Sequence, residues 1–243
     1  MLRLDLKKDL RYLYAPSAKE VSVVEAPRFN FVMADGEIEP AMRPGASPSF
    51  KEAMSALYGV SYTLKFMSKR RAENPMDYPV MALEGLWWTE TGEYDIADPE
   101  GWKYTVMIPQ PEHITSEMYE ETLRQLRKKR PDLNLGRLRF ESFEEGLCMQ
   151  IMHIGPYLKE PETLARMDAF AQANGYRVRG KHHEIYLGDP MRSAEEKLKT
   201  ILRHPIEKNL NRESKTQNLY RRRLGLGYLL MPILDAAHKA GKR

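Results

Sequence analysis

Along this chain, stretches in which hydrophobic and polar residues alternate are followed by stretches in which hydrophobic residues recur about every 3.6 positions. The first pattern predicts a β-strand and the second predicts a helix. Alternating residues from Phe29 to Met33, closed by Asp35-Gly36, predict a β-strand. Beyond a proline-rich loop, apolar residues spaced by about 3.6 positions predict a helix that begins after the N-cap Ser49 and ends near Arg71. The first strongly patterned part is therefore a strand followed by a helix.

The same order of elements then continues and repeats. Strands are predicted at residues 78–88 and 102–108, a helix at 115–130, a strand at 147–152, a helix at 160–173, and strands at 184–187 and 198–202. In each copy, the strand after the helix holds a carboxylate near aromatic residues, namely Glu84 in the first and Glu184 in the second.

The repetition predicts an α+β fold. We expect duplicated strand-helix-strand-strand modules, at about residues 20–112 and 137–206, that form a pseudo-symmetric antiparallel sheet with a central ligand cleft. We expect the helix at 115–130 to link the modules and residues 1–206 to form one domain.

Composition supports a globular protein and excludes several classes. The 243 residues are 42% hydrophobic, which is enough to bury a sizeable core. Cys148 is the single cysteine, so an intramolecular disulfide and a multi-cysteine zinc site are excluded, and we expect it to pack as a thiol in a reducing compartment. No apolar run approaches the roughly 18 residues of a membrane span. We therefore expect a cytoplasmic protein without a membrane partner.

The charge of the chain is concentrated at its C-terminal end. Residues 207–243 hold nine Lys or Arg and three acids, a net +6, which leaves −2 of the total +4 for residues 1–206. We expect the main body not to bind nucleic acid, because that needs clustered basic residues. Residues 207–243 are predicted to be a poorly ordered basic extension, with a membrane-surface or nucleic-acid role as the alternative. The oligomeric state stays open.

One polar segment carries candidate chemistry. If residues 182–187 form a strand, His182, Glu184 and Tyr186 share one face. A carboxylate held against aromatic rings is desolvated, and it can bind a cationic ligand or act as a general base on water. The alternative is a solvent-facing strand edge with ordinary surface charge. Adjacent His182 and His183 point to opposite faces, and no third ligand is evident, so we expect no metal and no organic cofactor.

Aromatic residues form the second candidate feature. Adjacent Trp87 and Trp88 on a strand face opposite sides, so one can line a pocket while the other enters the core, and the alternative is that both pack. Tyr157 follows Gly155-Pro156 at a strand-to-helix turn, where it either contacts a ligand or is an ordinary turn residue. The sequence lacks a phosphate-binding glycine loop, a G-x-S-x-G elbow and an H-E-x-x-H helix.

Several motifs in the same order resemble the stand-alone GyrI-like proteins, over roughly residues 10–206. The motifs are Gly59-Val60-Ser61-Tyr62-Thr63-Leu64-Lys65, Leu83-Glu84-Gly85-Leu86-Trp87-Trp88, His153-Ile154-Gly155-Pro156-Tyr157, His182-His183-Glu184-Ile185-Tyr186-Leu187 with Asp189-Pro190, and Glu196-Lys197-Leu198-Lys199-Thr200-Ile201-Leu202. The resemblance implies two modules around a ligand cleft, as in the effector-binding domains of multidrug-sensing transcription regulators. It also implies that planar aromatic or cationic small molecules are the partners.

The paired tryptophans resemble a subset that hydrolyses cyclopropane-bearing DNA alkylators of the yatakemycin and duocarmycin type within an aromatic cage. This resemblance implies Glu184 and Tyr157 as catalytic residues, and it implies a binding site formed by Trp87, Trp88, Tyr157, His182, Glu184 and Tyr186. The activity implied is cofactor-independent ring opening with water, which protects the cell. A non-catalytic protein that sequesters aromatic compounds is the alternative, and an inhibitor of DNA gyrase is a third reading by family name.

Overall fold

A computed structural model of the chain describes residues 2–90, 100–188 and 192–209. The chain divides into two compact units, residues 1–207 and 208–243, and the fold below is that of the first unit. The predicted basic extension lies, from residue 210 on, outside the described residues. Among the helices of the described ranges, none has the length and apolar character needed to cross a membrane.

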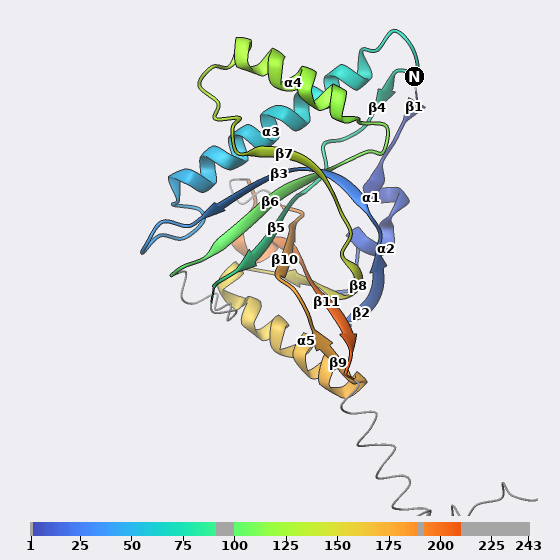
Figure 1. Cartoon of the computed structure of the whole chain (residues 1–243). Helices are drawn as coiled ribbons and strands as arrows, with labels where there is room; N and C mark the ends of the chain where they lie inside the picture. Colours follow the sequence, from blue (N-terminus) through green and yellow to red (C-terminus); the bar gives the residue numbers. More distant parts are fainter. Residues whose placement is uncertain (1, 91–99, 189–191, 210–243) are drawn as a thin grey trace, which may run out of the picture. The chain divides into compact units, whose positions relative to one another are not determined.

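One large sheet forms the centre of the first unit (Figure 1). Along the strand order β2-β8-β11-β10-β5-β6-β3-β7 every neighbouring pair is antiparallel, and β9 pairs with β11. The strands are β2 (Ser22–Ala26), β3 (Phe29–Glu37), β5 (Leu83–Trp88), β6 (Lys103–Gln110), β7 (Leu138–Phe143), β8 (Gly146–Ile154), β9 (Tyr176–Val178), β10 (His182–Tyr186) and β11 (Lys199–Lys208). A separate parallel pair joins β1 (Leu2–Arg3) to β4 (Met76–Asp77).

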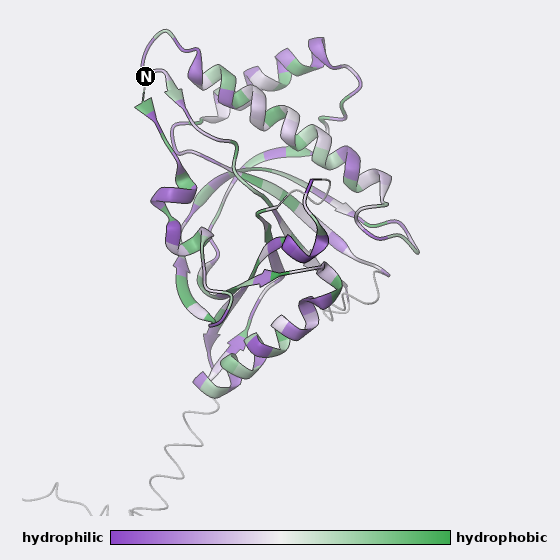
Figure 2. Ribbon diagram, turned by 180° about the vertical axis from the view of Figure 1, so that it is seen from behind, coloured by the Kyte–Doolittle hydropathy of each residue, from purple (hydrophilic) through white to green (hydrophobic). Residues whose placement is uncertain are grey.

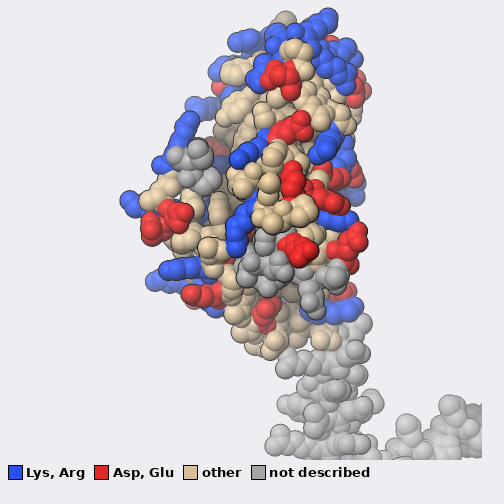
Figure 3. All heavy atoms as spheres, turned by 90° about the vertical axis from the view of Figure 1, so that its left-hand side faces the viewer, with Lys and Arg blue, Asp and Glu red and all other residues tan. Residues whose placement is uncertain are grey.

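Three longer helices accompany the sheet, and Figure 1 shows α3 and α4 together near β3 and α5 beyond β10 and β11. The helices are α1 (Leu6–Asp9), α2 (Arg11–Tyr14), α3 (Pro48–Lys69), α4 (Ser116–Lys129) and α5 (Glu160–Asn174), with short 3₁₀ turns at Tyr157–Lys159 and Glu195–Lys197. Hydrophilic and hydrophobic residues alternate along these helices in Figure 2, as expected of amphipathic helices packed on a core. Acidic and basic side chains are interspersed on the face seen in Figure 3.

The predicted duplication is confirmed. One copy runs β3-α3-β5-β6 and the other β8-α5-β10-β11, and the sheet order brings β5 and β10 together at its centre. Val60 of α3 packs in one buried cluster with Val32 and Val106, while Met167 of α5 packs with Ile151 in another. The strand register places these partners on one face of the sheet, so both helices cover the same face.

Two predicted boundaries are wrong for local reasons. The N-cap of α3 is Ser47 and not Ser49, because Pro48 occupies the first helical position and the Ser47 hydroxyl accepts the Phe50 N–H at 3.1 Å. The strand predicted at 78–88 joins the large sheet only from Leu83 on. Its first residues include a proline, which has no N–H to donate to a ladder.

Candidate functional site

The two central strands bring the predicted polar residues to one face. In the register of β10 and β5, His182 lies opposite Trp87 and Glu184 opposite Gly85, while Tyr186 lies two pairs further along, opposite Leu83. Residues directly opposite in an antiparallel pair share a face. His182, Glu184, Tyr186 and Trp87 therefore point to the face that α3 and α5 cover, and the predicted alternation of residues 182–186 is confirmed.

Three aromatic residues of the predicted set come together on this face. The Trp87 indole donates its Nε1–H to the Tyr186 hydroxyl at 2.9 Å. The Tyr186 ring meets the Tyr157 ring edge to face, with 6.0 Å between centroids. On its other sides the Trp87 ring packs near Phe50 and Trp102, at 5.6 and 5.7 Å. Trp87 is thus fixed in the core, while the two tyrosines stay partly exposed.

A glycine makes this arrangement possible. A Cβ atom on Gly85 would lie 2.8 Å from Trp87 Nε1 and 3.3 Å from the Tyr186 hydroxyl. Because the first distance is shorter than a side-chain contact allows, a larger residue at position 85 would push the indole away from Tyr186. The glycine of the Leu83–Trp88 strand therefore belongs to the site.

Trp88 is not brought together with the other predicted site residues. It lies on the opposite face of the sheet, where the Lys181 Nζ sits 3.1 Å from its ring centroid and Phe31 and Leu86 form the neighbouring cluster. Successive residues of a strand face opposite sides, so one tryptophan of the pair had to leave the site. Trp87 is the one on the face of Glu184.

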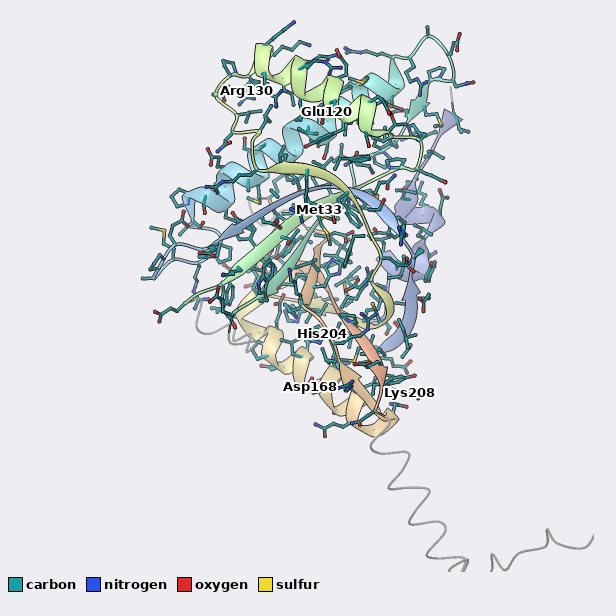
Figure 4. The ribbon with its side chains drawn as sticks, viewed as in Figure 1. Met33, Glu120, Arg130, Asp168, His204 and Lys208 are labelled. Carbon is teal, nitrogen blue, oxygen red and sulfur yellow. The ribbon has the colours of Figure 1, made fainter. Side chains whose placement is uncertain are left out.

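Glu184 is a buried acid, so the alternative of a solvent-facing strand edge is excluded for it. Only 5% of the residue is exposed, and its Oε1 lies 3.0 Å from His182 Nε2. The other ring nitrogen of His182, Nδ1, lies 2.7 Å from His204 Nε2. Figure 4 labels His204 on β11, next to β10. Burial lowers the pKa of His204 to about 3, with His182 adding to the effect, so His204 is neutral.

Glu160, the first residue of α5, is a site residue that the sequence analysis missed. It is fully buried, and one carboxyl oxygen of Glu160, one of Glu184 and a ring nitrogen of His182 all lie within 4.8 Å of one another. Burial and the nearby Glu184 carboxylate raise the pKa of Glu160 to about 10. An acid at a helix N-terminus normally lies in solvent near the helix dipole, so no pattern in the sequence pointed to it.

The reverse face of the central strands holds a second buried charged cluster. His183 bridges two carboxylates, with Nε2 3.1 Å from Glu84 and Nδ1 2.9 Å from Glu145. Burial alone would lower the pKa of His183, but these carboxylates raise it to about 9. The Tyr14 hydroxyl donates to Glu84 at 3.0 Å, and Arg203 adds a further positive charge. A small cavity on this face is lined by the cluster together with Phe29, Phe31 and Phe143.

Comparisons with known proteins agree with this architecture. Three solved structures from Listeria innocua each cover 84% of this chain and are covered completely by it. They are a conserved protein at 38% identity and a TM-score of 0.76, and two hydrolases at 36% and 35% identity with TM-scores of 0.75 and 0.72. A search of curated proteins found no match.

The model of one protein family, the GyrI-like small molecule binding domain, matches residues 19–207. That range contains both copies of the strand-helix-strand-strand unit and every residue described on the helix-covered face. The chain therefore belongs to the GyrI-like small-molecule-binding family.

Proposed function

We propose that the chain binds bulky planar aromatic compounds, cationic ones included, and hydrolyses cyclopropane-bearing DNA alkylators of the yatakemycin and duocarmycin type. The observation that carries the proposal is one buried carboxylate, Glu184, on the same sheet face as a bonded Trp87–Tyr186 pair and the adjoining Tyr157. The likeness to two Listeria hydrolases at 35–36% identity supports the choice of a hydrolytic reaction.

The aromatic rings bind the substrate in this scheme. Flat ligands stack on aromatic side chains, and a ring face attracts positive charge that develops in a neighbouring group. The hydrogen bond from Trp87 fixes the orientation of Tyr186, and the edge-to-face contact fixes Tyr157 against it. We assign the ligand-facing rings of the cage to the partly exposed Tyr157 and Tyr186, with the core-packed Trp87 behind them, and leave Trp88, on the opposite face, out of it.

Glu184 performs the proton transfer, with Tyr157 orienting the water. A water oxygen forms a bond to the cyclopropane CH₂ carbon while the bond from that CH₂ carbon to the spiro ring carbon breaks. The electron pair of that bond passes into the conjugated carbonyl of the alkylator, which becomes a phenolate and then takes a proton. Glu184 accepts the proton that the water loses, so the net change is addition of one water. His182, at 3.0 Å, orients the carboxylate.

The test is incubation with such an alkylator in the presence of EDTA, followed by chromatography of the ring-opened product. Glu184→Gln is expected to lower kcat/KM by about 100-fold or more, the usual contribution of a general base. Glu162→Gln, an exposed glutamate on the same helix as Glu160, is the matched control and should retain full turnover. Equal turnover by Glu184→Gln and the unchanged protein would remove Glu184 from the mechanism.

Sequestration without chemistry is the second candidate, because the family description names small-molecule binding alone. Trp87 reports on it, since its indole is hydrogen-bonded to Tyr186 of the proposed cage. Saturable quenching of tryptophan fluorescence by the alkylator, with no ring-opened product, would favour sequestration. Quenching that is followed by product formation would favour hydrolysis.

A further inference from the structure

The geometry points to a binding site for one divalent transition-metal ion of the zinc type, formed by Glu160, His182 and Glu184. The three residues come from the start of α5 and from β10, and each offers one ligand atom within 4.8 Å of the other two. All three are buried, with at most 6% of any residue exposed. The sequence predicted no metal because His183 points away from His182 and no third ligand was evident, whereas the fold brings Glu160 of α5 beside His182 and Glu184.

Glu160 gives the independent support for a ligand. Both of its carboxyl oxygens are buried, and neither forms a hydrogen bond of ordinary geometry with a described residue, although the side chains of Thr200 and Glu184 lie close enough to affect its pKa. A buried polar group without a partner is costly, and buried acids are normally paired or coordinate a metal. A cation among the three side chains would bind a Glu160 oxygen and neutralise the two carboxylates together.

The donor set selects the class of ion. One imidazole nitrogen and two carboxylate oxygens suit Zn²⁺ and Co²⁺, whereas Ca²⁺ and Mg²⁺ take oxygen ligands only. Around a tetrahedral Zn²⁺, with bonds of about 2.0–2.1 Å, neighbouring ligand atoms lie about 3.3 Å apart. His182 Nε2 and Glu184 Oε1 already lie 3.0 Å apart, and the Glu160 oxygen lies within 4.8 Å of the other two ligand atoms, so small side-chain rotations of Glu160 and Glu184 can give this spacing.

His204 contacts the ring nitrogen of His182 that would not bind the metal. With a metal on Nε2, His182 carries its proton on Nδ1 and donates it to His204 Nε2, which lies 2.7 Å away. A ligand histidine normally has such a partner for its second nitrogen, and loss of the partner weakens metal binding by about 10–100-fold. His204 is therefore a positioning residue for the proposed site.

The experiment is equilibrium dialysis of the full chain against Zn²⁺, with metal measured by elemental analysis. We expect one tightly held ion per chain. Glu160→Gln and His182→Gln should each weaken binding by about tenfold or more, because losing a residue that binds the metal directly costs more than losing a hydrogen-bond partner of such a residue. Glu162→Gln is the control and should bind as the unchanged protein does. Equal Zn²⁺ binding by Glu160→Gln, with its fold verified by circular dichroism, would overturn the proposal.

A second measurement needs no variant. Co²⁺ added to the unchanged protein is expected to give visible d–d bands stronger than those of aqueous Co²⁺, because a low-coordinate site with a nitrogen ligand intensifies them. A spectrum identical to that of aqueous Co²⁺ would overturn the site. The inference does not rest on the proposed function, which is tested by turnover in EDTA, so failure of one leaves the other standing.

Discussion

Arg203 lies at the centre of the buried cluster on the reverse face, and its replacement by methionine should strongly destabilise the fold. The guanidinium donates to Gln150 Oε1 and to the Leu13 carbonyl, both at 3.1 Å, and to Glu145 Oε2 at 3.5 Å. Only 3% of Arg203 is exposed. Methionine keeps most of the volume and removes the charge and every donor.

The magnitude follows from what each partner loses. Removing one member of a buried ion pair costs about 3–5 kcal/mol, and the two neutral acceptors each lose a hydrogen bond worth about 1 kcal/mol. Glu145 keeps His183 at 2.9 Å, and the methionine side chain returns about 1–2 kcal/mol by apolar burial. Burial alone would raise the pKa of Glu145, but His183 and Arg203 lower it to about 2, so it stays ionised and needs these cations. We expect a net loss of about 3–6 kcal/mol.

Urea denaturation followed by far-ultraviolet circular dichroism measures this loss. The slope of the unfolding free energy against urea concentration should stay the same, because the surface exposed on unfolding does not change, while the urea concentration at the midpoint falls. The control is Arg177→Met, whose surface ion pair with Glu207 is exposed and whose loss should cost no more than about 1 kcal/mol. The double variant Glu145→Leu/Arg203→Met should regain much of the stability, because an apolar pair can replace a buried ion pair. A loss below about 1 kcal/mol for Arg203→Met would refute the reasoning.

Three further predictions concern other regions. Gly85→Ala should destabilise the protein by about 1–3 kcal/mol in urea denaturation and shift its tryptophan emission, because the added methyl group displaces the Trp87 indole. Cys148, whose thiol pKa is raised by burial, should stay unmodified by a thiol reagent in the native protein and react fully in urea. Hydrogen bonds from two lysines of α3 lower the pKa of Asp77 from 3.8 to about 2. Its contribution to stability should be present above about pH 4 and lost as the pH falls toward 2, and Asp77→Asn should remove that part of the acid dependence in urea titrations.

The order of the elements could be predicted because its signals are local. Asn174-Gly175 ends α5 as expected, with Gly175 in the left-handed conformation at φ 67°. The shared face of His182, Glu184 and Tyr186 followed from strand alternation in the same way. The second acid of the site, Glu160, could not be predicted, because a glutamate at the start of a helix becomes buried only when that helix packs on the sheet. The packing of α5 on β8 and β11 depends on residues far away in the sequence.

The two halves of the fold contribute unequally to the site. Glu84 and Glu184 look like counterparts in the sequence, but a two-fold axis perpendicular to the sheet must keep equivalent side chains on one face. The register places Glu184 opposite Gly85 and Glu84 opposite Ile185, so the two acids point to opposite faces. Strand β10 therefore supplies the acid on the helix-covered face, while β5 supplies a glycine there and the Trp87 indole beside it. The duplicated strands β5 and β10 thus form the sheet on which the site lies, and differences at single positions place an acid, Glu184, on β10 and an aromatic residue, Trp87, on β5.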